Sequence, residues 1–384
     1  MFALTPRRGN TSWGLPLRAG SALWLAVSLM LVIPATVQAQ GSPHGHWVSD
    51  PAGIATPGFV YDLPPAGFNP LSASDSVLRD WGFPPRPSSV DPVAYARWQK
   101  MVGSKWVTAR LRFTGIYNGP ARNLRVQSSV GNTTDTTSQN WSGWVISPTT
   151  DLFSTNSTSI TGSWAAPAVL PWPLGATCSS ATYATSQWVG FDGFTSSDVL
   201  QAGTQTNCGN SAYFWYEWYP NAETEVDIGL LPGHFVGVSV YYDDAALSSS
   251  PGYAVLCNDT TDACSSVGFS PPAGTTYAGN SAEWIVERPE VNGVLADLPN
   301  YGDLVMAQAY GDVPGTGGYS ATKLPTGTTL YEVSMTCPPW NPSSECTGTT
   351  EISVPSQFGV LSEFGTVTGV ESALSFAFQS GALN

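Results

Sequence analysis

The stretch AYFWYEWY at residues 212–219 alternates between two sets of side chains and decides the fold class. Successive side chains of a β-strand point to opposite faces, so such a segment presents two different surfaces. One face would carry aromatic rings around a carboxylate: Tyr213, Trp215, Glu217 and Tyr219. The other would carry only apolar and aromatic groups: Ala212, Phe214, Tyr216 and Trp218. The segment therefore predicts a strand buried on at least one side.

Short runs of the same kind recur from Asn140 onward, separated by clusters of Gly, Pro, Asn and Ser. They are NWSGWVI (140–146), SITGSWAA (159–166), SQWVGFDG (186–193), DVLQAG (198–203), FVGVSVYYD (235–243), SAEWIVE (281–287), DLVMAQAY (303–310), TTLYEVSM (328–335) and FGVLS (358–362). No segment in this part has a helical stripe of useful length. We therefore expect residues 136–384 to form one all-β domain, an antiparallel β-sandwich of two packed sheets, with a barrel as the alternative.

The first 39 residues have the pattern of an export signal. Arg7, Arg8 and Arg18 precede an apolar run at 22–37, and small residues follow where a signal peptidase cuts. The alternative is an uncleaved anchor, but the run is shorter than the roughly 20 apolar residues that span a bilayer. We expect residues 1–39 to be removed and the product to be secreted and extracellular, with no later membrane segment.

Residues 40–135 are expected to be a proregion and linker. The stretch to about residue 87 is rich in Pro and Gly and has too little periodic apolar content to pack alone. Residues 92–102 suggest a short helix with Asp91 as its N-cap. KWVTARLRFTGIYNG (105–119) alternates like a strand. The polar stretch 129–139 is expected to be a linker that a protease cuts during maturation.

Charge divides the chain at the same place. Residues 1–129 hold 12 Lys and Arg against 5 Asp and Glu, which gives +7, and the rest holds 2 against 23, which gives −21; the sum is the −14 of the whole chain. An acidic domain of this kind repels nucleic acid and anionic membranes, so we exclude both as partners. The balance suits an acid environment, because protonated carboxyls are neutral. The alternative is that the acidic surface only aids solubility.

The cysteine and histidine content excludes several chemistries. An even number of cysteines follows the export signal and predicts disulfides, and the three sequential pairs would close short loops that fit hairpin ends. The six cysteines are Cys178, Cys208, Cys257, Cys264, Cys337 and Cys346. The chain has no CxxC motif, and His234 is the only histidine after His46, so we expect no metal and no other cofactor. The same scarcity argues against Ser-His-Asp and Cys-His catalysis.

Several of the predicted strands bring acidic and aromatic side chains to one face. Glu283 and Glu287 share a face in SAEWIVE, and Trp188 and Asp192 share one in SQWVGFDG. Gln201 points opposite to Leu200. Such faces are typical of a substrate groove across a sheet, and equally of a solvated sheet surface. The alternation alone does not distinguish the two.

Six segments in this order resemble the eqolisin, or glutamic peptidase, family. They are Asn140-Trp141-Ser142-Gly143, Ile160-Thr161-Gly162-Ser163-Trp164, Trp188-Val189-Gly190-Phe191-Asp192-Gly193, Val199-Leu200-Gln201-Ala202-Gly203, Trp215-Tyr216-Glu217-Trp218-Tyr219-Pro220 and Ala282-Glu283-Trp284-Ile285-Val286-Glu287. The likeness covers roughly residues 140–310. It implies a concanavalin-like sandwich whose concave face carries a catalytic Glu and Gln, here Glu287 and Gln201.

The resemblance also implies supporting residues around that pair. The positions that line or support the site are Trp141, Trp188, Asp192, Trp215, Glu217, Tyr219 and Glu283. Two features depart from the family pattern. Tyr213 stands where the family often has an Asp, which could alter the tuning of Glu217, and the tail after about residue 311 differs.

The residue types support peptide hydrolysis in acid. Glu287 as a carboxylate would take a proton from water and return it to the leaving nitrogen, while Gln201 would hold the water and donate to the oxyanion. The expected activity is therefore that of an acid endopeptidase on polypeptides, acting as a monomer. The basic proregion is expected to dock on the acidic domain as an intramolecular inhibitor, with a role as folding or export spacer as the alternative. The second candidate function is a carbohydrate-active or carbohydrate-binding sandwich protein, because aromatic grooves also hold sugars.

Overall fold

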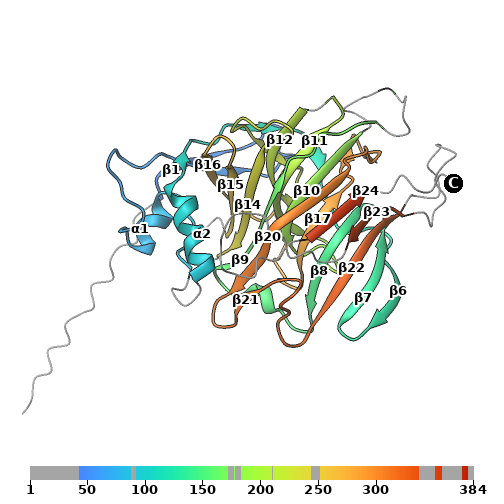
Figure 1. Ribbon diagram of the computed structural model, residues 1–384. Coiled ribbons are helices and arrows are strands. Elements are labelled where there is room, and N and C mark those ends of the chain that lie inside the picture. Colours follow the sequence, from blue (N-terminus) through green and yellow to red (C-terminus); the bar gives the residue numbers. More distant parts are fainter. Residues whose placement is uncertain are drawn as a thin grey trace, which may run out of the picture. The chain divides into compact units, whose positions relative to one another are not determined.

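The structure, a computed structural model, consists mainly of β-strands (Figure 1). It describes residues 43–87, 92–171, 177, 183–209, 211–243, 251–336, 351–356 and 374–378. Each strand-like run expected between residues 140 and 335 forms a strand, so the all-β prediction is confirmed. The expected signal at 1–39 and the run at 358–362 lie outside the described residues.

One sheet, called here the site sheet, carries the predicted catalytic residues. Its order is β4 (Leu111–Phe113), β13 (Thr224–Val226), β12 (Ser211–Tyr219), β11 (Val199–Asn207), β10 (Ala184–Phe191), β17 (Ala282–Glu287), β8 (Trp141–Pro148), β22 (Thr328–Thr336), β7 (Thr133–Ser138) and β6 (Arg125–Val130). Its pairs are antiparallel except for β7 with β22, which is parallel.

A second sheet, the back sheet, covers one face of the site sheet. Its order is β1 (Gly45–Val48), β2 (Gly58–Tyr61), β16 (Ala263–Phe269), β15 (Gly252–Asn258), β14 (Phe235–Tyr242), β9 (Thr158–Ala165), β20 (Asp303–Val313) and β21 (Gly317–Tyr319). β3 (Lys105–Trp106) lies parallel to the end of β16. A small sheet contains β5 (Ile116–Tyr117), β18 (Glu290–Val291) and β19 (Val294–Leu295).

The two large sheets are joined through the long strand β20. Its first residues pair with β24 (Leu374–Phe378), which continues through β23 (Glu351–Ser356) to β22 of the site sheet. Its later residues pair with β9 of the back sheet. The change of partner falls between Met306 and Ala307, and a bulge between Ala307 and Tyr310, where Gln308 has φ of 56°, interrupts the pairing with β9 just after it begins. One strand therefore belongs to both layers.

The core lies between the sheets and follows the alternation that the sequence predicts. The site sheet contributes buried inner-face side chains that include Trp144, Val189, Phe214, Tyr216, Trp218, Trp284 and Val286. The back sheet contributes Ile160, Trp164, Val236, Val238, Val240, Leu256 and Met306, among others. Complete burial of such side chains gives each about 1.5–3 kcal/mol of transfer free energy. The opposite face of the site sheet, called the outer face, is thereby left for the polar residues.

The N-terminal part of the chain adds strands to both sheets. β2 pairs with β16, and β4 pairs with β13. The expected helix at 92–102 is confirmed as α2 (Pro92–Gly103), and a second helix, α1 (Asp75–Asp80), precedes it; Asp91 lies outside the described residues. Both helices close a small cluster made of Leu78, Phe83, Trp98 and Val102. The low apolar content noted in the sequence is thus compensated by packing on the sandwich.

The prediction of a polar linker at 129–139 is wrong. These residues complete β6 and form β7, which pairs along its whole length with β22. Thr134, Thr136 and Thr137 are buried there. The physical reason is that β-branched threonine is a good strand residue despite its polarity, because its methyl group packs while its hydroxyl forms hydrogen bonds. A cut in this hairpin would have to open a paired strand.

One predicted disulfide lies entirely within the described residues. Cys257 and Cys264 face each other across the β15–β16 hairpin and are bonded, with Cα atoms 4.1 Å apart. Cys208 is also disulfide-bonded, whereas Cys178, Cys337 and Cys346 lie outside the described residues. Among the helices that the structure describes, none has the length and apolar content needed to cross a bilayer.

Candidate active site

Gln201 and Glu287 lie on the outer face of the site sheet, on the two strands that flank β10. Gln201 of β11 is opposite Gly190, and Glu287, the last residue of β17, is opposite Ser186. Directly paired residues point to the same face of a sheet. Both side chains are buried, although they lie outside the apolar core.

The carboxylate of Glu287 is held by three N–H donors. Oε1 accepts from the Asn140 side-chain amide at 3.0 Å and from the Gly119 backbone at 3.1 Å. Oε2 accepts from the Trp188 indole at 2.9 Å. Burial raises the pKa of Glu287 well above its ordinary value, and these hydrogen bonds offset part of that effect. The donors fix the direction in which each oxygen can accept or release a proton.

Gln201 is oriented by a carboxylate on the neighbouring strand. Its Nε2 donates to Glu217 Oε2 at 3.1 Å, and the two residues are direct cross-strand partners. The same Nε2 donates to the backbone carbonyl of Asn118. Gln201 Oε1 is buried and has no hydrogen-bond partner among the described residues. The side-chain amide of Gln201 is therefore oriented with its Nε2 on the Asn118 carbonyl, while its Oε1 has no partner among the described residues.

Glu217 and Glu223 are two acidic side chains that both contact Asn118. Asn118 donates its backbone N–H to Glu217 at 2.9 Å and its side-chain N–H to Glu223 at 2.8 Å. Tyr213, the departure from the family pattern, donates its hydroxyl to Glu223 at 2.8 Å. Burial raises the pKa of Glu223 to about 7, and burial together with the Glu223 charge raises the pKa of Glu217 well above its ordinary value. Tyr213 thus acts on Glu217 through its neighbour.

Aromatic side chains form the wall around these groups. Trp141 and Trp188 meet edge to face with ring centroids 5.0 Å apart, and Trp215 lies in the same buried cluster. The indole of Trp141 donates to Gly119 O at 2.9 Å. Tyr219 packs beside Gly119, so closely that a Cβ at that glycine would lie 3.1 Å from the ring. The wall excludes water, and the indole N–H groups of Trp141 and Trp188 donate to Gly119 O and to the Glu287 carboxyl.

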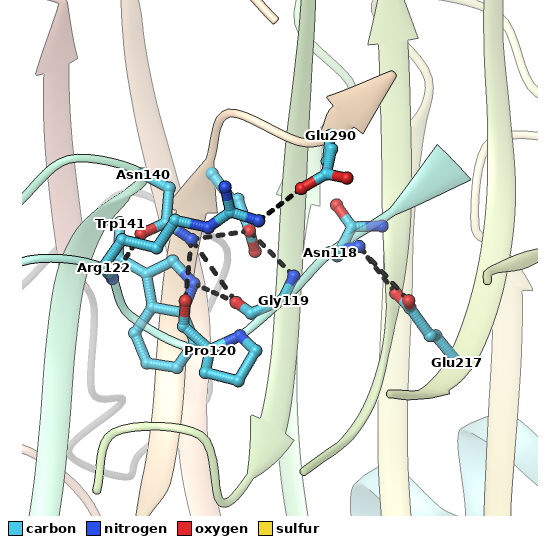
Figure 2. Close-up of polar contacts among 9 residues, drawn as sticks. Asn118, Gly119, Pro120, Arg122, Asn140, Trp141, Glu217 and Glu290 are labelled. Carbon is cyan, nitrogen blue, oxygen red and sulfur yellow. Dashed lines mark hydrogen bonds and ion pairs between the residues drawn. The ribbon is translucent and has the colours of Figure 1, made fainter. Parts of the chain in front are cut away.

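A segment from the N-terminal region lies over the site (Figure 2). We call residues 116–124 the cover segment. Besides the contacts of Asn118 and Gly119, the carbonyl of Pro120 accepts from Asn140 Nδ2 at 3.1 Å. Ala121 and Leu124 pack against the aromatic cluster. The buried state of both predicted catalytic residues depends on this segment.

Ion pairs hold the cover segment and the strand before it. Arg122 bonds Glu290 beside the site. Arg112 of β4 contacts Glu225 at 2.9 Å and Asp227 at 2.7 Å. Arginines of the N-terminal region therefore pair with acidic residues of the later domain, as the charge division of the sequence suggests.

Two predicted supporting residues do not touch the catalytic pair. The carboxylate of Asp192, at the end of β10, accepts the backbone N–H groups of Ala278, Gly279 and Asn280 at 2.7–3.0 Å. It thereby fixes the loop that leads into β17. Glu283 is buried opposite Gly190, and no hydrogen bond reaches its carboxyl oxygens among the described residues. Burial raises the pKa of Glu283 well above its ordinary value.

Sequence reasoning missed four residues of the site: Asn118, Gly119, Asn140 and Glu223. Asn140 opens the quoted NWSG motif, so its position was visible although its contact with Glu287 was not. Glu223 follows the WYEWYP motif closely but belongs to no motif. Asn118 and Gly119 contact partners 83 to 168 residues away, and no local pattern marks such contacts.

The arrangement can support hydrolysis of a carbonyl compound. Gln201 donates an N–H to the carbonyl oxygen of Asn118. Glu287 places a titratable oxygen beside the nitrogen of Gly119, which is bonded to the same carbonyl carbon. A donor at the oxygen stabilises developing negative charge, and a carboxyl near the leaving atom can protonate it. No cation is needed for either role.

Comparison with known proteins agrees with this chemistry. The peptidase A4 family model matches residues 139–354. Aspergillopepsin-2 of Aspergillus niger is 29% identical over 207 residues, which are 50% of this chain and 70% of that protein. Scytalidopepsin B of Scytalidium lignicola is 33% identical over 106 residues, 27% of this chain and 39% of that protein.

Solved structures of the same group are also similar. A crystal structure of scytalido-glutamic peptidase with a peptide-based transition-state analogue covers 63% of this chain and 98% of its own, at 20% identity and a TM-score of 0.45. The aspergilloglutamic peptidase from Aspergillus niger covers 51% and 99%, at 23% identity and a TM-score of 0.36. The family match spans more than half of the chain. The chain therefore belongs to the peptidase A4 family of glutamic peptidases, the eqolisins, and is a glutamic-type endopeptidase.

Proposed function

We propose that this peptidase is exported and hydrolyses polypeptides in acid, with Glu287 as general base and then general acid, and Gln201 as the oxyanion donor. One observation carries the assignment of roles. Gln201 Nε2 donates to the carbonyl oxygen of Asn118, while Glu287 Oε1 contacts the nitrogen of Gly119 at 3.1 Å. The two side chains reach opposite ends of one peptide unit. A peptidase dyad needs one group at the carbonyl oxygen and the other at the leaving nitrogen.

The reaction follows from these positions. Glu287 removes a proton from a water, and the hydroxide adds to the carbonyl carbon. Gln201 Nε2 stabilises the negative oxygen of the tetrahedral intermediate, and its Oε1 is available to position the water. Glu287 then gives the proton to the leaving nitrogen and the C–N bond breaks. Trp188 and Asn140 keep the carboxyl in place through both proton transfers.

The acid preference depends on uncovering the site. Under the cover segment, burial is the main cause that raises the pKa of Glu287. When the segment leaves, water reaches the carboxyl, and its pKa moves back toward the ordinary Glu value of about 4.3. Glu287 is then ionised, as a general base must be, in moderately acid solution.

Residues 40–135 act in this proposal as a proregion that inhibits the domain at 136–384. Support comes from the cover segment, whose backbone uses the donors and acceptors that a substrate would need. It also comes from the family match, which begins at residue 139. The ion pairs of Arg112 and Arg122 add to the attachment. The export signal at 1–39 and the monomeric state complete the proposal.

Substitution of Glu287 and of Gln201 tests their two proposed roles. The purified full-length chain is incubated in acid with a denatured protein, and released peptides are quantified. Glu287→Gln and Gln201→Glu should each lower the rate by at least about 100-fold, because general base and oxyanion stabilisation each contribute that much or more.

Gln205→Glu is the matched control. Gln205 lies on the same face of β11 and is equally buried, but it bonds Ser186 and Asn207 instead of the cover segment. Circular dichroism shows whether each variant is folded. A folded Glu287→Gln protein with a rate within tenfold of the wild type would show that the general base is another group.

A further inference from the structure

The peptide bond between Asn118 and Gly119 lies across the two catalytic groups. Its oxygen accepts from Gln201 Nε2, and its nitrogen is 3.1 Å from Glu287 Oε1. Gln201 and Glu287 thus contact both the oxygen and the nitrogen of this peptide unit of the cover segment. The backbone around it follows β5 directly and runs over the outer face of the site sheet, as a bound substrate would.

We infer that Asn118–Gly119 is the bond that this peptidase cleaves first in its own chain. The inference rests on the proposed function, since it takes Glu287 and Gln201 as the hydrolytic pair. It goes further in naming the processing site, which lies before the β6–β7 hairpin and not within it. Asn118 then provides the acyl side of the cleaved bond, and Gly119 provides the amine side.

Both sides of the bond are fixed by contacts that do not involve the pair. On the acyl side, Glu223 holds the Asn118 side chain at 2.8 Å and Glu217 holds its N–H at 2.9 Å. β5, directly before Asn118, pairs with β18. These contacts resist sliding of the chain by one residue, so the register of the bond is specified.

On the amine side, the carbonyls of the next two residues are held as well. The Trp141 indole donates to Gly119 O at 2.9 Å, and Asn140 donates to Pro120 O at 3.1 Å. Glycine is required at 119 by space, because a Cβ would come within 3.1 Å of the Tyr219 ring. Fixing both flanks removes most of the entropy cost of aligning a reacting bond.

The hydrolytic step balances with water as the only co-reactant. Gln201 Oε1, a buried acceptor with no partner among the described residues, can hold that water. Glu287 takes one proton from the water, and the oxygen bonds to the Asn118 carbonyl carbon. The C–N bond breaks, and the same proton goes to the Gly119 nitrogen. The products are a carboxylic acid at Asn118, which keeps the second proton of the water, and a free amine at Gly119.

The uncut chain is held in a resting arrangement. The Gly119 N–H donates directly to the Glu287 oxygen that must activate the water. The segment has to shift far enough to admit one water before the reaction can start, and this hydration also moves the pKa of Glu287 back toward its ordinary value, so that the carboxyl can ionise and act as the base.

Time-resolved mapping of the new N-terminus tests the inference. Full-length precursor is acidified at several protein concentrations, and products are followed by intact mass and N-terminal sequencing. The first new N-terminus should be Gly119, and its rate of appearance should not depend on protein concentration, since the reaction is within one chain. A different first N-terminus, or a rate that rises with concentration, would overturn the inference.

Two variants sharpen the result. Gly119→Pro puts a ring carbon on the nitrogen beside Glu287 and a Cβ about 3.1 Å from the Tyr219 ring; both displace the bond from the pair and should slow the first cut by at least about 100-fold. Gly131→Asn, in the β6–β7 turn where φ is 61°, should leave it unchanged, because Asn tolerates that conformation. Should Gly119→Pro fail to fold, the mapping of the wild type decides alone.

Failure of the inference is distinguishable from failure of the proposed function. Peptide release from an added denatured protein, together with a first cut elsewhere, rejects only the processing site. Absence of peptide release from any substrate, with the precursor intact, rejects the catalytic pair and the processing site together.

Discussion

The two faces of the site sheet are built from the same strands but are buried in different ways. On the inner face, Phe214 and Trp284 are enclosed by the back sheet in a dry core. On the outer face, Glu217 and Glu287 are covered by a crossing segment that supplies backbone N–H donors to both carboxyl groups, and its Arg122 acts on Glu287 through charge alone while it pairs with Glu290. Inner-face burial is permanent, whereas outer-face burial lasts only while the cover segment stays. In the function proposed above, the difference separates the groups that stabilise the fold from those that perform chemistry.

The largest stability effect is expected on the inner face. Trp284 is fully buried and donates its indole N–H to Thr161 O at 2.9 Å. Trp284→Ala should lower the free energy of unfolding by about 3–5 kcal/mol, through lost packing and a cavity. Denaturant unfolding monitored by circular dichroism measures it. Trp47→Ala, at a residue 40% exposed, serves as control, and equal losses in the two variants would contradict the contrast between the faces.

A smaller, pH-dependent effect is expected on the outer face. Because burial raises the pKa of Glu223 from 4.5 to about 7, the folded chain favours the protonated group. This contribution to stability is complete below the unfolded pKa and is lost as the pH rises through about 7. Glu223→Gln should therefore reduce the loss of unfolding free energy between acid and neutral pH by up to about 3 kcal/mol.

Unfolding curves across that pH range measure the effect of Glu223→Gln. Asp62→Asn, at an exposed position, is the control and should keep the slope of the wild type. A variant slope equal to that of the wild type would show that Glu223 is not the titrating group.

The smallest effect is expected at the edge of the cover. Arg112 is largely exposed where it meets Glu225 and Asp227. Arg112→Ala should lower the free energy of unfolding of the precursor by no more than about 1 kcal/mol. The loss should disappear at high salt, because exposed charges are screened. Arg110→Ala, a neighbouring exposed arginine, should have no salt-dependent effect, and a salt-independent loss at Arg112 would point to packing instead.

The sequence predicted one face of this comparison well and the other only in part. Alternation in AYFWYEWY and SAEWIVE placed Glu217 and Glu287 on the face opposite to the core, since the strand period is a local property. The strand ACSSVGF of the β15–β16 hairpin was not predicted from its own pattern, because it contains few of the β-branched and aromatic residues that mark a strand; only the short Cys257–Cys264 spacing pointed to a hairpin end. Its stability comes from pairing and from the Cys257–Cys264 bond.

The cover over the outer face could not be predicted, because it depends on contacts distant in sequence. Asn118 and Gly119 lie in a strand-like stretch with no catalytic motif, and their backbone atoms form most of the important contacts. Backbone groups are the same at every residue, so composition carries no sign of them. The hairpin at 129–139 was missed for a related reason: threonine is polar by composition yet favoured in strands.

The double membership of β20 determines how substrate can enter. Since this strand pairs with β9 and with β24, pulling the layers apart would break main-chain hydrogen bonds in both. A peptide therefore cannot be admitted by a hinge between the sheets, as it is in enzymes whose lobes close on the substrate. Access has to come from above the outer face, and the rigid frame beneath it needs no rearrangement between one turnover and the next.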